Sequence, residues 1–501
     1  MGKILHINDL TPNKKIFNEK FKTVLCHGVF DVLHYGHLLH FHSAKKNVDK
    51  LIVSITPDEF VNKGPDRPYF NVDLRAKMIA ELDIVDLIII NDTPTAIKVI
   101  KKVKPSFYAK GNEYLDSKKD LTGNINKEIK ELEKNKGKII FTNEDTYSSS
   151  NIINSFLSDN KSQRSFLRKN LINKKTIFSN IDKLNSLNVC LLGEVILDEY
   201  NYVKVLAKSP KENVISTLNK ETQVFYGGII ATANNISNFV KNLTLICMVG
   251  ENYKKLDLKK KLNKNITLIP IIKKGSETIR KKRFIQKSNL HKFFQIQYMS
   301  NQNIDKFNKT KVKKLLKNVD KKFDLLVIND FGHDFIDQEL CNFIDNLKIF
   351  KSINVQTNSS NYGYNLITKY KKADYISIDL PEAQLAVSSK SNDCRVLAEK
   401  ILEKVNYNIL SITRGHEGSS VFFNKNKSSI DIPAMVSNTI DTMGAGDAYF
   451  SITSVLSYLG VKNFELGFIG NCAGGITSNI IGHSNYVDIN YLKRFIETKL
   501  K

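Results

Sequence analysis

The sequence predicts an α/β protein built from two doubly wound domains. Three observations support this fold class. Short continuous apolar runs alternate with helical patterns, which is typical of parallel sheets covered by helices on both faces. This alternation is interrupted once, by a polar and basic stretch at residues 158–186. The chain of 501 residues is also too long for one ordinary hydrophobic core, so more than one domain is expected.

The first predicted domain covers residues 20–157. It follows a polar segment, residues 1–20, which we expect to be a loosely held lead-in. Apolar runs predict a buried strand from Val24 and further strands at 51–55, 87–90, 107–109 and 138–141. Amphipathic patterns predict helices at 72–82 and 95–103. Ligands bind such sheets at the carboxyl ends of the strands.

Residues 158–186 are expected to form a linker with helical content, and the second predicted domain covers residues 187–499. Alternation of polar and apolar residues over 201–226 predicts exposed strands in a small side sheet. Buried strands are predicted from Val189 and at 244–249, 325–328, 375–378, 409–413 and 420–423. Helices are predicted at 229–239, 447–459 and 465–480.

Composition narrows the class of partner. The 75 Lys and Arg residues against 51 Asp and Glu give a net charge of +24. Because this charge is spread along the chain without an arginine-rich block, we expect phosphorylated small ligands rather than nucleic acid. Six scattered cysteines without a C-x-x-C pair indicate reduced thiols in a cytoplasmic protein. No apolar run reaches the ~18 residues that a membrane span needs, so no membrane contact is expected.

The stretch from Val24 to His37 predicts a phosphate site. A buried strand leads through Gly28 into a helix that is expected to start near His37. The free N–H groups of a helix N-terminus favour phosphate, and a glycine lets the ligand approach the backbone. His34 and His37, three residues apart, can aim both imidazoles at one cluster of phosphate oxygens. A partial metal site and two structural histidines are the alternatives that the pattern leaves open.

The run G-V-F-D-V-L-H-Y-G-H within this stretch resembles the signature of the cytidylyltransferase-like nucleotidyltransferases. The resemblance continues through Lys63, Arg75 and the serines at 148–150, which match the serine-rich helix N-terminus that closes the family's domain. It implies a Rossmann-like fold in which His34 and His37 are catalytic. It also implies that nucleotide and phosphate are bound by Gly28, Phe30, Lys63, Arg75, Ser148, Ser149 and Ser150.

A second phosphate site is predicted at residues 441–447, which read D-T-M-G-A-G-D and precede an apolar helix. The glycines clear space for phosphate against the backbone, and the helix N-terminus supplies N–H donors. Asp447 at that position can accept a proton from an attacking hydroxyl. Asp and Gly near a helix start are more often caps than catalysts, but this pattern is much more specific than a generic glycine loop.

This motif resembles the hallmark of the ribokinase-like sugar kinases, and the resemblance covers roughly residues 186–497. It implies a ribokinase-like fold with a small β lid and Asp447 as the catalytic base. The resemblance places nucleotide or phosphate contacts at Thr413, Gly415, Gly418, Thr442, Gly444, Ala445 and Gly446. Within these kinases, residues 197–200 and 278–283 are most similar to the kinase half of the bifunctional heptose kinase/nucleotidyltransferases. Here the two halves stand in the reverse of the commonest order.

The heptose-kinase resemblance implies sugar contacts at Asp198, Gly227, Gly228 and Asn234, and a metal-organising pair at Asp379 and Glu382. Two departures stand out. Asp379 replaces the first residue of the usual N-x-x-E. Ile229, Ile230 and Ala231 stand where those kinases have small residues and a sugar-binding asparagine. We therefore expect the transfer chemistry to be kept better than the sugar pocket.

Together the two resemblances imply a cytoplasmic enzyme of nucleotide-activated sugar synthesis, supplying precursors of surface glycans. One half would phosphorylate a sugar or sugar phosphate with ATP and Mg²⁺. The other half would join a nucleotide to a sugar 1-phosphate, giving an ADP-heptose-like product and pyrophosphate. A homodimer through the lid is the expected assembly. The alternatives are a CTP-dependent polyol-phosphate cytidylyltransferase fused to a different kinase, and a non-catalytic nucleotide-binding regulator.

Overall fold

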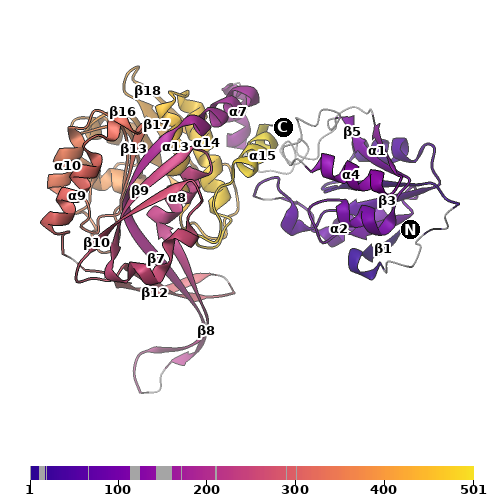
Figure 1. Cartoon of the computed structure of the whole chain (residues 1–501), viewed down its shortest axis with the longest axis horizontal. Coiled ribbons are helices and arrows are strands. Elements are labelled where there is room, and N and C mark those ends of the chain that lie inside the picture. Colours follow the sequence, from indigo (N-terminus) through magenta and orange to yellow (C-terminus); the bar gives the residue numbers. More distant parts are fainter. Residues whose placement is uncertain are drawn as a thin grey trace. The chain divides into compact units, whose positions relative to one another are not determined.

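The computed structural model describes residues 2–10, 17, 20–65, 67–112, 124–142, 161–170, 172–208, 211–288, 290–300 and 302–500 (Figure 1). By its contacts the chain divides into two compact units. The first unit comprises residues 1–159 and 493–501, and the second comprises residues 160–492. Within these described ranges, no helix is both long and apolar enough to cross a membrane.

The first unit is a parallel sheet with helices between its strands. Its strands are β1 (Lys3–His6), β2 (Thr23–Gly28), β3 (Lys50–Ile55), β4 (Leu87–Ile90), β5 (Phe107–Gly111) and β6 (Lys138–Thr142). Its helices are α1 (Tyr35–Lys45), α2 (Val72–Ala80), α3 (Ile97–Val103) and α4 (Ile125–Lys134). The strand order is β1-β4-β3-β2-β5-β6. From β2, the chain adds β3 and β4 on one side and later β5 and β6 on the other. Ligands of such sheets bind outside the carboxyl ends of the strands at this point, which here are the ends of β2 and β5, directly before α1.

The expectation of a loosely held lead-in at residues 1–20 is wrong for the described part of that segment. β1 pairs in parallel with β4, from Lys3 opposite Leu87 to His6 opposite Ile90. Ile7 and Leu10 beyond it are buried in the core. The ammonium of Lys102 donates to the carbonyls of both, at 2.8 and 2.9 Å. The segment is an edge strand followed by an anchored turn.

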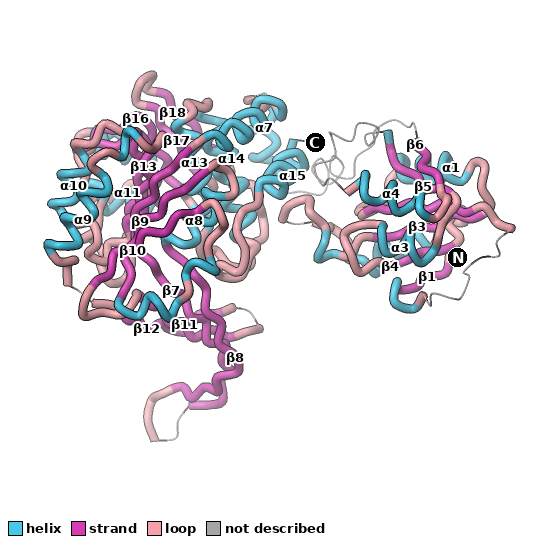
Figure 2. Tube along the Cα trace, viewed as in Figure 1, coloured by secondary structure: helices cyan, strands magenta, loops and turns pink. Residues whose placement is uncertain are grey.

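The second unit has a long mixed sheet and a smaller lid sheet. Its strands are β7 (Asn188–Lys208), β8 (Ile215–Gly228), β9 (Asn242–Gly250), β10 (Ile266–Lys273), β11 (Ile279–Gln286), β12 (His291–Tyr298), β13 (Leu325–Asp330), β14 (Phe350–Val355), β15 (Lys372–Asp379), β16 (Asn406–Thr413), β17 (Ser419–Phe423) and β18 (Ser428–Ile432). The main order is β10-β9-β7-β13-β14-β15-β16-β17-β18, parallel as far as β16. These strands lie between helices (Figure 2).

The helices of this unit are α6 (Lys161–Lys169), α7 (Lys174–Lys183), α8 (Ile229–Ser237), α9 (Lys306–Leu316), α10 (Gln338–Asp345), α11 (Leu380–Ala386), α12 (Cys394–Leu402), α13 (Ala445–Tyr458) and α14 (Asn463–Thr477), and α15 (Ile489–Leu500) follows. The stretch interpreted as a linker contributes α6 and α7, which bury Phe166, Ile177 and Ile181. Contacts assign both helices to the second unit.

The lid is formed by β8, the second half of β7, β11 and β12. The alternating pattern over 201–226 predicted the strands of β7 and β8, but not β11 and β12. β7 is continuous, so its first half lies in the main sheet and its second half carries the lid (Figure 1). A small core of Tyr200, Tyr202, Phe225 and Ile285 holds the lid strands together. Residues on β7 and β11 are thereby fixed at the boundary between lid and main sheet, where the predicted sugar residues lie.

Candidate active sites

In the first unit, His34 and His37 cap α1 reciprocally. The N–H of Gly36 donates to His34 Nδ1 at 3.1 Å, and the N–H of His34 donates to His37 Nδ1 at 3.4 Å. The two rings stack with centroids 3.9 Å apart. Because each Nδ1 accepts from the backbone, the proton of each neutral ring belongs on Nε2. The caps therefore set both imidazoles as Nε2–H donors beside the N-terminus of a helix, which itself attracts phosphate.

Both rings are neutral at pH 7. Burial, with smaller effects from His34, Lys63 and His40, lowers the pKa of His37 to about 3. Burial and Lys63 lower the pKa of His34 as well. The fixed positive charge near an incoming phosphate therefore comes from Lys63, while the histidines supply directed hydrogen bonds. Three of the predicted site residues are thus brought together.

Phe30 and Gly28 shape the wall beneath the histidines. The Phe30 ring contacts His37 and Phe41, with centroid distances of 5.5 and 5.2 Å. A Cβ on Gly28 would stand 3.1 Å from that ring, closer than ordinary packing permits. Phe30 is almost fully buried. It would therefore act on a ligand indirectly, by packing against His37. Ser148, Ser149 and Ser150 lie outside the described residues.

Arg75 is not placed as a phosphate ligand, contrary to the prediction. Its side chain is only 1% exposed. The guanidinium donates to the carbonyls of Phe70, Val29 and Thr56 and forms an ion pair with Asp58 at 2.5 Å. An arginine on a helix can face the ligand or the core, and here it ties the loop after β3 to α2. The motif match could not distinguish the two orientations.

One residue of this site was missed, although it lies inside the recognised motif. Asp31 is buried and accepts from the N–H groups of Tyr69 and Phe70 at 2.8 and 3.0 Å. It thereby connects the turn after β2 with the segment that leads into α2. The aspartate between two apolar residues of a buried turn was the available signal, because a buried carboxylate needs hydrogen-bond partners.

In the second unit, α13 begins at the predicted phosphate loop. Gly444, at φ +79°, is its N-cap. A side chain there would be strained and would collide with His483, so the glycine is required. Thr442 and Gly446 are exposed, and a Cβ on Gly446 would meet nothing within 4 Å. The N–H of Ala445 donates to the Thr442 carbonyl at 3.3 Å, and the space beside Gly446 is open, as close approach of an anion to this helix start requires.

Asp447 lies in the first turn of α13 with 9% of its surface exposed. Its Oδ1 accepts from the Gln356 amide at 2.7 Å and from the Asn329 amide at 3.4 Å. Burial raises the pKa of Asp447, while His483 and the two amides oppose that rise. A buried carboxylate that is held by neutral donors at a helix N-terminus is suited to accept a hydroxyl proton.

The predicted sugar residues Asp198, Gly227 and Gly228 lie together where the lid meets α8. Asp198 pairs with Arg283, and its Oδ2 is 3.7 Å from His483 Nε2. A Cβ on Gly227 would collide with Asp198, so the glycine lets the carboxylate pass close to the backbone. Gly228, at φ +54°, is the N-cap of α8. Sequence reasoning included Arg283 only within a matching run and missed His483, which no local pattern marks.

Asn234 is not placed as a sugar ligand. It is fully buried, its amide nitrogen donates to the Lys261 carbonyl at 2.8 Å, and its Oδ1 accepts from the N–H of Asn263 at 3.0 Å. Its neighbour Asn235 is likewise occupied, accepting from the N–H of Val487. Ala231 on the same helix is also fully buried. The amide that Ala231 lacks is therefore not replaced by either asparagine.

Asp379 and Glu382 form a capping box at the start of α11. Asp379 Oδ1 accepts from the N–H of Glu382, and Glu382 Oε2 accepts from the N–H of Asp379. Glu382 Oε1 also accepts from the N–H of Thr357 at 2.9 Å. Burial and the charge of Asp379 raise the pKa of Glu382. The pair explains the local helix start, and its role toward a metal remains a prediction.

Mg²⁺ needs few protein ligands when substrate phosphates and water complete its shell. Across the residues that the structure describes, no group of three or more His, Cys, Asp or Glu side chains could hold a metal by itself. Asp379 and Glu382 are carboxylates, the ligand type that Mg²⁺ prefers, and Glu382 is close enough to the proposed base Asp447 to interact with it electrostatically. The residues therefore fit a metal that is held jointly with a nucleotide.

Thr413, Gly415 and Gly418 lie at the end of β16 and in the following turn. Gly415 and Gly418 both have positive φ, at +56° and +102°. A side chain on Gly418 would collide with the carbonyl of Ile432. Thr413 pairs with Asp379 across the ends of β16 and β15, so this turn is adjacent to the capping box. That placement is compatible with the predicted nucleotide contacts, which stay predictions.

Two family models match the chain: the pfkB family carbohydrate kinase model at residues 186–454 and the cytidylyltransferase-like model at residues 25–155. A bifunctional protein HldE from Campylobacter fetus is 40% identical over 97 residues, 19% of this chain and 21% of that protein. Another from Syntrophotalea carbinolica is 22% identical over 311 residues, 61% of this chain and 62% of that protein. The chain thus spans about a fifth of the first and less than two thirds of the second.

Among solved structures, a ribokinase from Giardia lamblia is 16% identical with a TM-score of 0.50, and the match covers 63% of this chain and 100% of that one. This likeness concerns the fold. Together with the family models it confirms the predicted fold class, a Rossmann-like unit followed by a ribokinase-like unit.

Proposed function

We propose a two-step function for this chain, which belongs to the pfkB family of carbohydrate kinases and also carries a cytidylyltransferase-like domain. The second unit transfers the γ-phosphate of ATP to a hydroxyl of a sugar or sugar phosphate. The first unit joins a nucleotide to a sugar 1-phosphate and releases pyrophosphate. The product is a nucleotide-activated sugar, an ADP-heptose in the simplest case, made in the cytoplasm as a precursor of surface glycans.

The observation that carries the kinase proposal is the position of Asp447 at the N-terminus of α13. The acceptor hydroxyl would lie near Asp198 and transfer its proton to Asp447 as its oxygen attacks the γ-phosphorus. The bond from that phosphorus to the β-bridging oxygen breaks, and ADP leaves. The first N–H groups of α13, after Gly444, would stabilise the charge on the transferred group. Mg²⁺, when bound, neutralises phosphate charge, and Asp379 and Glu382 would hold it together with the nucleotide.

For the nucleotidyl transfer, the stacked pair His34 and His37 carries the proposal. An oxygen of the sugar 1-phosphate attacks the α-phosphorus of the nucleoside triphosphate, and the bond to the β-phosphate breaks. The Nε2–H donors and Lys63 would stabilise the charge on the α-phosphate and on the departing pyrophosphate. A phosphatase on another chain would act between the two steps, because a kinase product with two phosphates must lose one.

A homodimer through the lid fits the exposed apolar side chains on its strands. These include Leu206, Ile215, Leu218, Val224 and Phe294, which are 45–61% exposed. Exposed apolar side chains on several strands of one small sheet favour association with another surface. Light scattering of the full chain, compared with a variant in which Leu206 and Ile215 are changed to Ser, tests this assembly.

The test of the proposed function is a scan of hexoses, heptoses and their terminal and 1-phosphates with ATP or CTP and Mg²⁺. ADP release and pyrophosphate release are followed separately. We expect ADP release with a sugar or its terminal phosphate, and pyrophosphate release with a sugar 1-phosphate. Faster pyrophosphate release with CTP would replace ADP-sugar by CDP-linked products. Neither release with any compound, in protein that still binds ATP, would favour a non-catalytic regulator.

A further inference from the structure

Two strand ends converge on Asp447 from the main sheet. Asn329 is the penultimate residue of β13, and Gln356 follows directly after β14. β13 and β14 pair in parallel with Asn329 opposite Asn354, so Asn329 and Gln356, two residues further on, point to the same face. That face is the one against α13, where both amides reach Asp447 Oδ1.

The other oxygen of Asp447, Oδ2, makes no hydrogen bond to any described residue. Oδ1 is occupied by two donors, so the carboxylate cannot turn without losing them. This division leaves one oxygen for the acceptor hydroxyl and fixes its direction. Without such donors, a carboxylate on a helix can rotate, and its reacting oxygen would be misplaced for much of the time.

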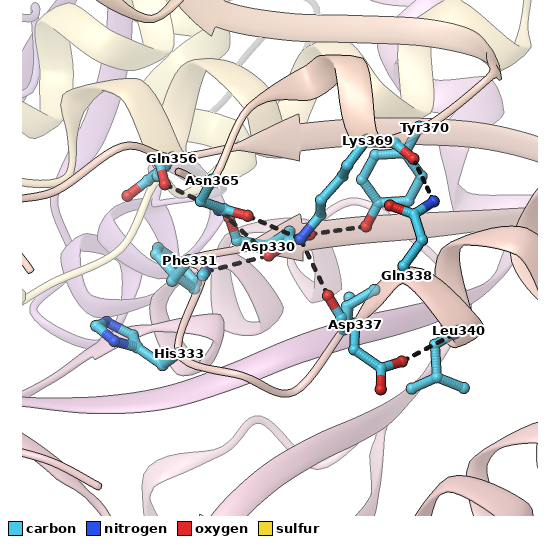
Figure 3. A network of polar contacts seen from close by, with 12 residues as sticks. Asp330, Phe331, His333, Asp337, Gln338, Leu340, Gln356, Asn365, Lys369 and Tyr370 are labelled. Atoms are coloured by element: carbon cyan, nitrogen blue, oxygen red, sulfur yellow. Dashed lines mark hydrogen bonds and ion pairs between the residues drawn. The ribbon is translucent and has the colours of Figure 1, made fainter. Parts of the chain in front are cut away.

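A buried polar network surrounds Asp330, the last residue of β13, which follows Asn329 directly (Figure 3). Asp330 is fully buried and pairs with the Lys369 ammonium at 2.5 Å, and it accepts from the Tyr370 hydroxyl at 2.8 Å. Lys369 also donates to Asn365 Oδ1 at 2.7 Å. Every charged member of this group is paired, as a buried network requires.

Asn365 connects that network to Gln356. Its amide nitrogen lies 3.1 Å from the carbonyl oxygens of both Gln356 and Asp330, and Figure 3 shows it between the two. The N–H of Gln356 in turn donates to the Asp330 carbonyl at 2.9 Å. The N–H of Gln356 is therefore held by the end of β13 and its carbonyl by Asn365, so the backbone that carries its side chain is fixed on both sides.

From this geometry we propose that Gln356, supported by Asn329, is the positioning residue for the carboxylate of Asp447, and that the Asp330–Lys369–Asn365 network holds Gln356 in place. The inference rests on the proposed function, because it assigns Asp447 the role of base. Gln356 acts through Asp447 and touches no reacting atom.

Other titratable groups also face Asp447. They are His483, Asp198 on β7, Lys281 on β11 and Glu382 on α11. Gln356 differs from them because it is neutral and bonded directly to the carboxylate. Its replacement by a carboxylate of the same length adds a like charge at hydrogen-bond distance and leaves the other four groups unchanged.

Three variants test the proposal: Gln356→Met, Gln356→Glu and the control Gln384→Met. Gln356 is partly exposed, so the first two are expected to fold. The control removes an amide that donates to Ser391 and Asn392 in the same unit. ADP release is measured across pH with the acceptor that wild type uses fastest. Gln356→Met should lower kcat about 10- to 100-fold with the KM of the acceptor nearly unchanged.

Gln356→Glu should move the acidic limb of the kcat profile to higher pH by about one unit, since a like charge keeps Asp447 protonated for longer. Gln384→Met should behave as wild type. A wild-type kcat in Gln356→Met, or an unmoved acidic limb in Gln356→Glu, would overturn the inference while leaving the kinase assignment intact.

A measurement that needs no turnover keeps the two claims separate. The infrared band of the protonated Asp447 carboxyl, identified by its loss in Asp447→Asn, is titrated in wild type and in both Gln356 variants. The band should persist to higher pH in Gln356→Met and in Gln356→Glu. Identical titration in all three would overturn the inference whether or not the protein phosphorylates a sugar.

Discussion

Lys292 on lid strand β12 forms an ion pair with Asp441, the first residue of the phosphate loop, with 3.0 Å between Nζ and Oδ1. Asp441 Oδ2 accepts from the Tyr200 hydroxyl on β7 at 2.9 Å and from the N–H of Gly482 at 3.0 Å. The lid is therefore connected directly to the loop that precedes α13. Burial opposes ionisation of Asp441, but Gly482 and Lys292 hold its pKa below the ordinary value.

Removing that cation should impair the kinase. In Lys292→Met the buried carboxylate of Asp441 keeps its charge and loses its ionic partner, which loosens the loop after it. We expect kcat/KM for ATP in ADP release to fall about 10-fold, with pyrophosphate release unchanged. Lys287→Met is the control, because its ion pair with Glu221 is on the exposed part of the lid. Equal behaviour of the two variants would contradict a role of Lys292 in the loop.

The fold could be predicted where apolar runs are continuous. The runs that became β2, β3, β4, β13 and β16 all lie in the interiors of the two main sheets. β1 was missed because an edge strand with exposed Lys3 and Ile4 leaves no such run. β10 was missed for a related reason: it lies at a sheet edge, where Pro270 is tolerated although it interrupts the pattern.

The candidate sites could be predicted where one short segment contains both the helix start that can bind phosphate and the reacting side chain. His34 and His37 cap the helix they begin, and Asp447 follows its own glycines. Residues that reach a site from distant segments left no local signal. Gln356 and Lys292 are examples, separated from their carboxylate partners by 91 and 149 residues. Arg75 shows the converse, because a matching residue can turn toward the core.

The first unit should lose stability as the pH falls. Burial lowers the pKa of His27 and His37 to about 3 and of His40 to about 4, whereas an unfolded histidine titrates near 6.5. Below pH ~6.5 the unfolded chain therefore binds protons that the folded chain refuses. At pH 5 each group should cost about 1–2 kcal/mol of unfolding free energy.

Hydrogen exchange of peptides from β2 and β3, corrected for intrinsic rates, measures that free energy in the full chain. His40→Gln keeps a donor and an acceptor near Thr142, which His40 contacts at 2.8 Å, and should flatten the decline between pH 7 and pH 5. A decline as steep in this variant as in wild type would show that other groups cause it.

Glu382→Gln tests the metal role of the capping box. If Glu382 helps to hold Mg²⁺, the Mg²⁺ concentration for half-maximal ADP release should rise about 10-fold in the variant. Asp393→Asn is a matched control, because Asp393 caps α12 by accepting from the N–H of Arg395 at 2.8 Å. An unchanged Mg²⁺ requirement in Glu382→Gln would leave the pair as a structural cap, worth about 1 kcal/mol.

Sugar choice should differ from that of the standard heptose kinases. Ala231 has no amide, and the side-chain oxygens of Asn234 and Asn235 already accept hydrogen bonds from the N–H groups of Asn263 and Val487. A sugar hydroxyl that needs an amide as its hydrogen-bond partner would stay unsatisfied against α8. We expect a higher kcat/KM with an analogue of heptose 7-phosphate that is deoxygenated or epimeric at one carbon. A clear preference for standard heptose 7-phosphate would show that α8 does not form the pocket wall.

The central claim is that two separate phosphate sites perform two reactions in one chain. Wild type, Asp447→Asn and His37→Ala are compared in a single assay that follows ADP and pyrophosphate separately. Asp447→Asn should lower ADP release at least about 100-fold and leave pyrophosphate release near the wild-type rate, and His37→Ala should do the reverse. A folded variant of either residue that silences both releases together would contradict the account.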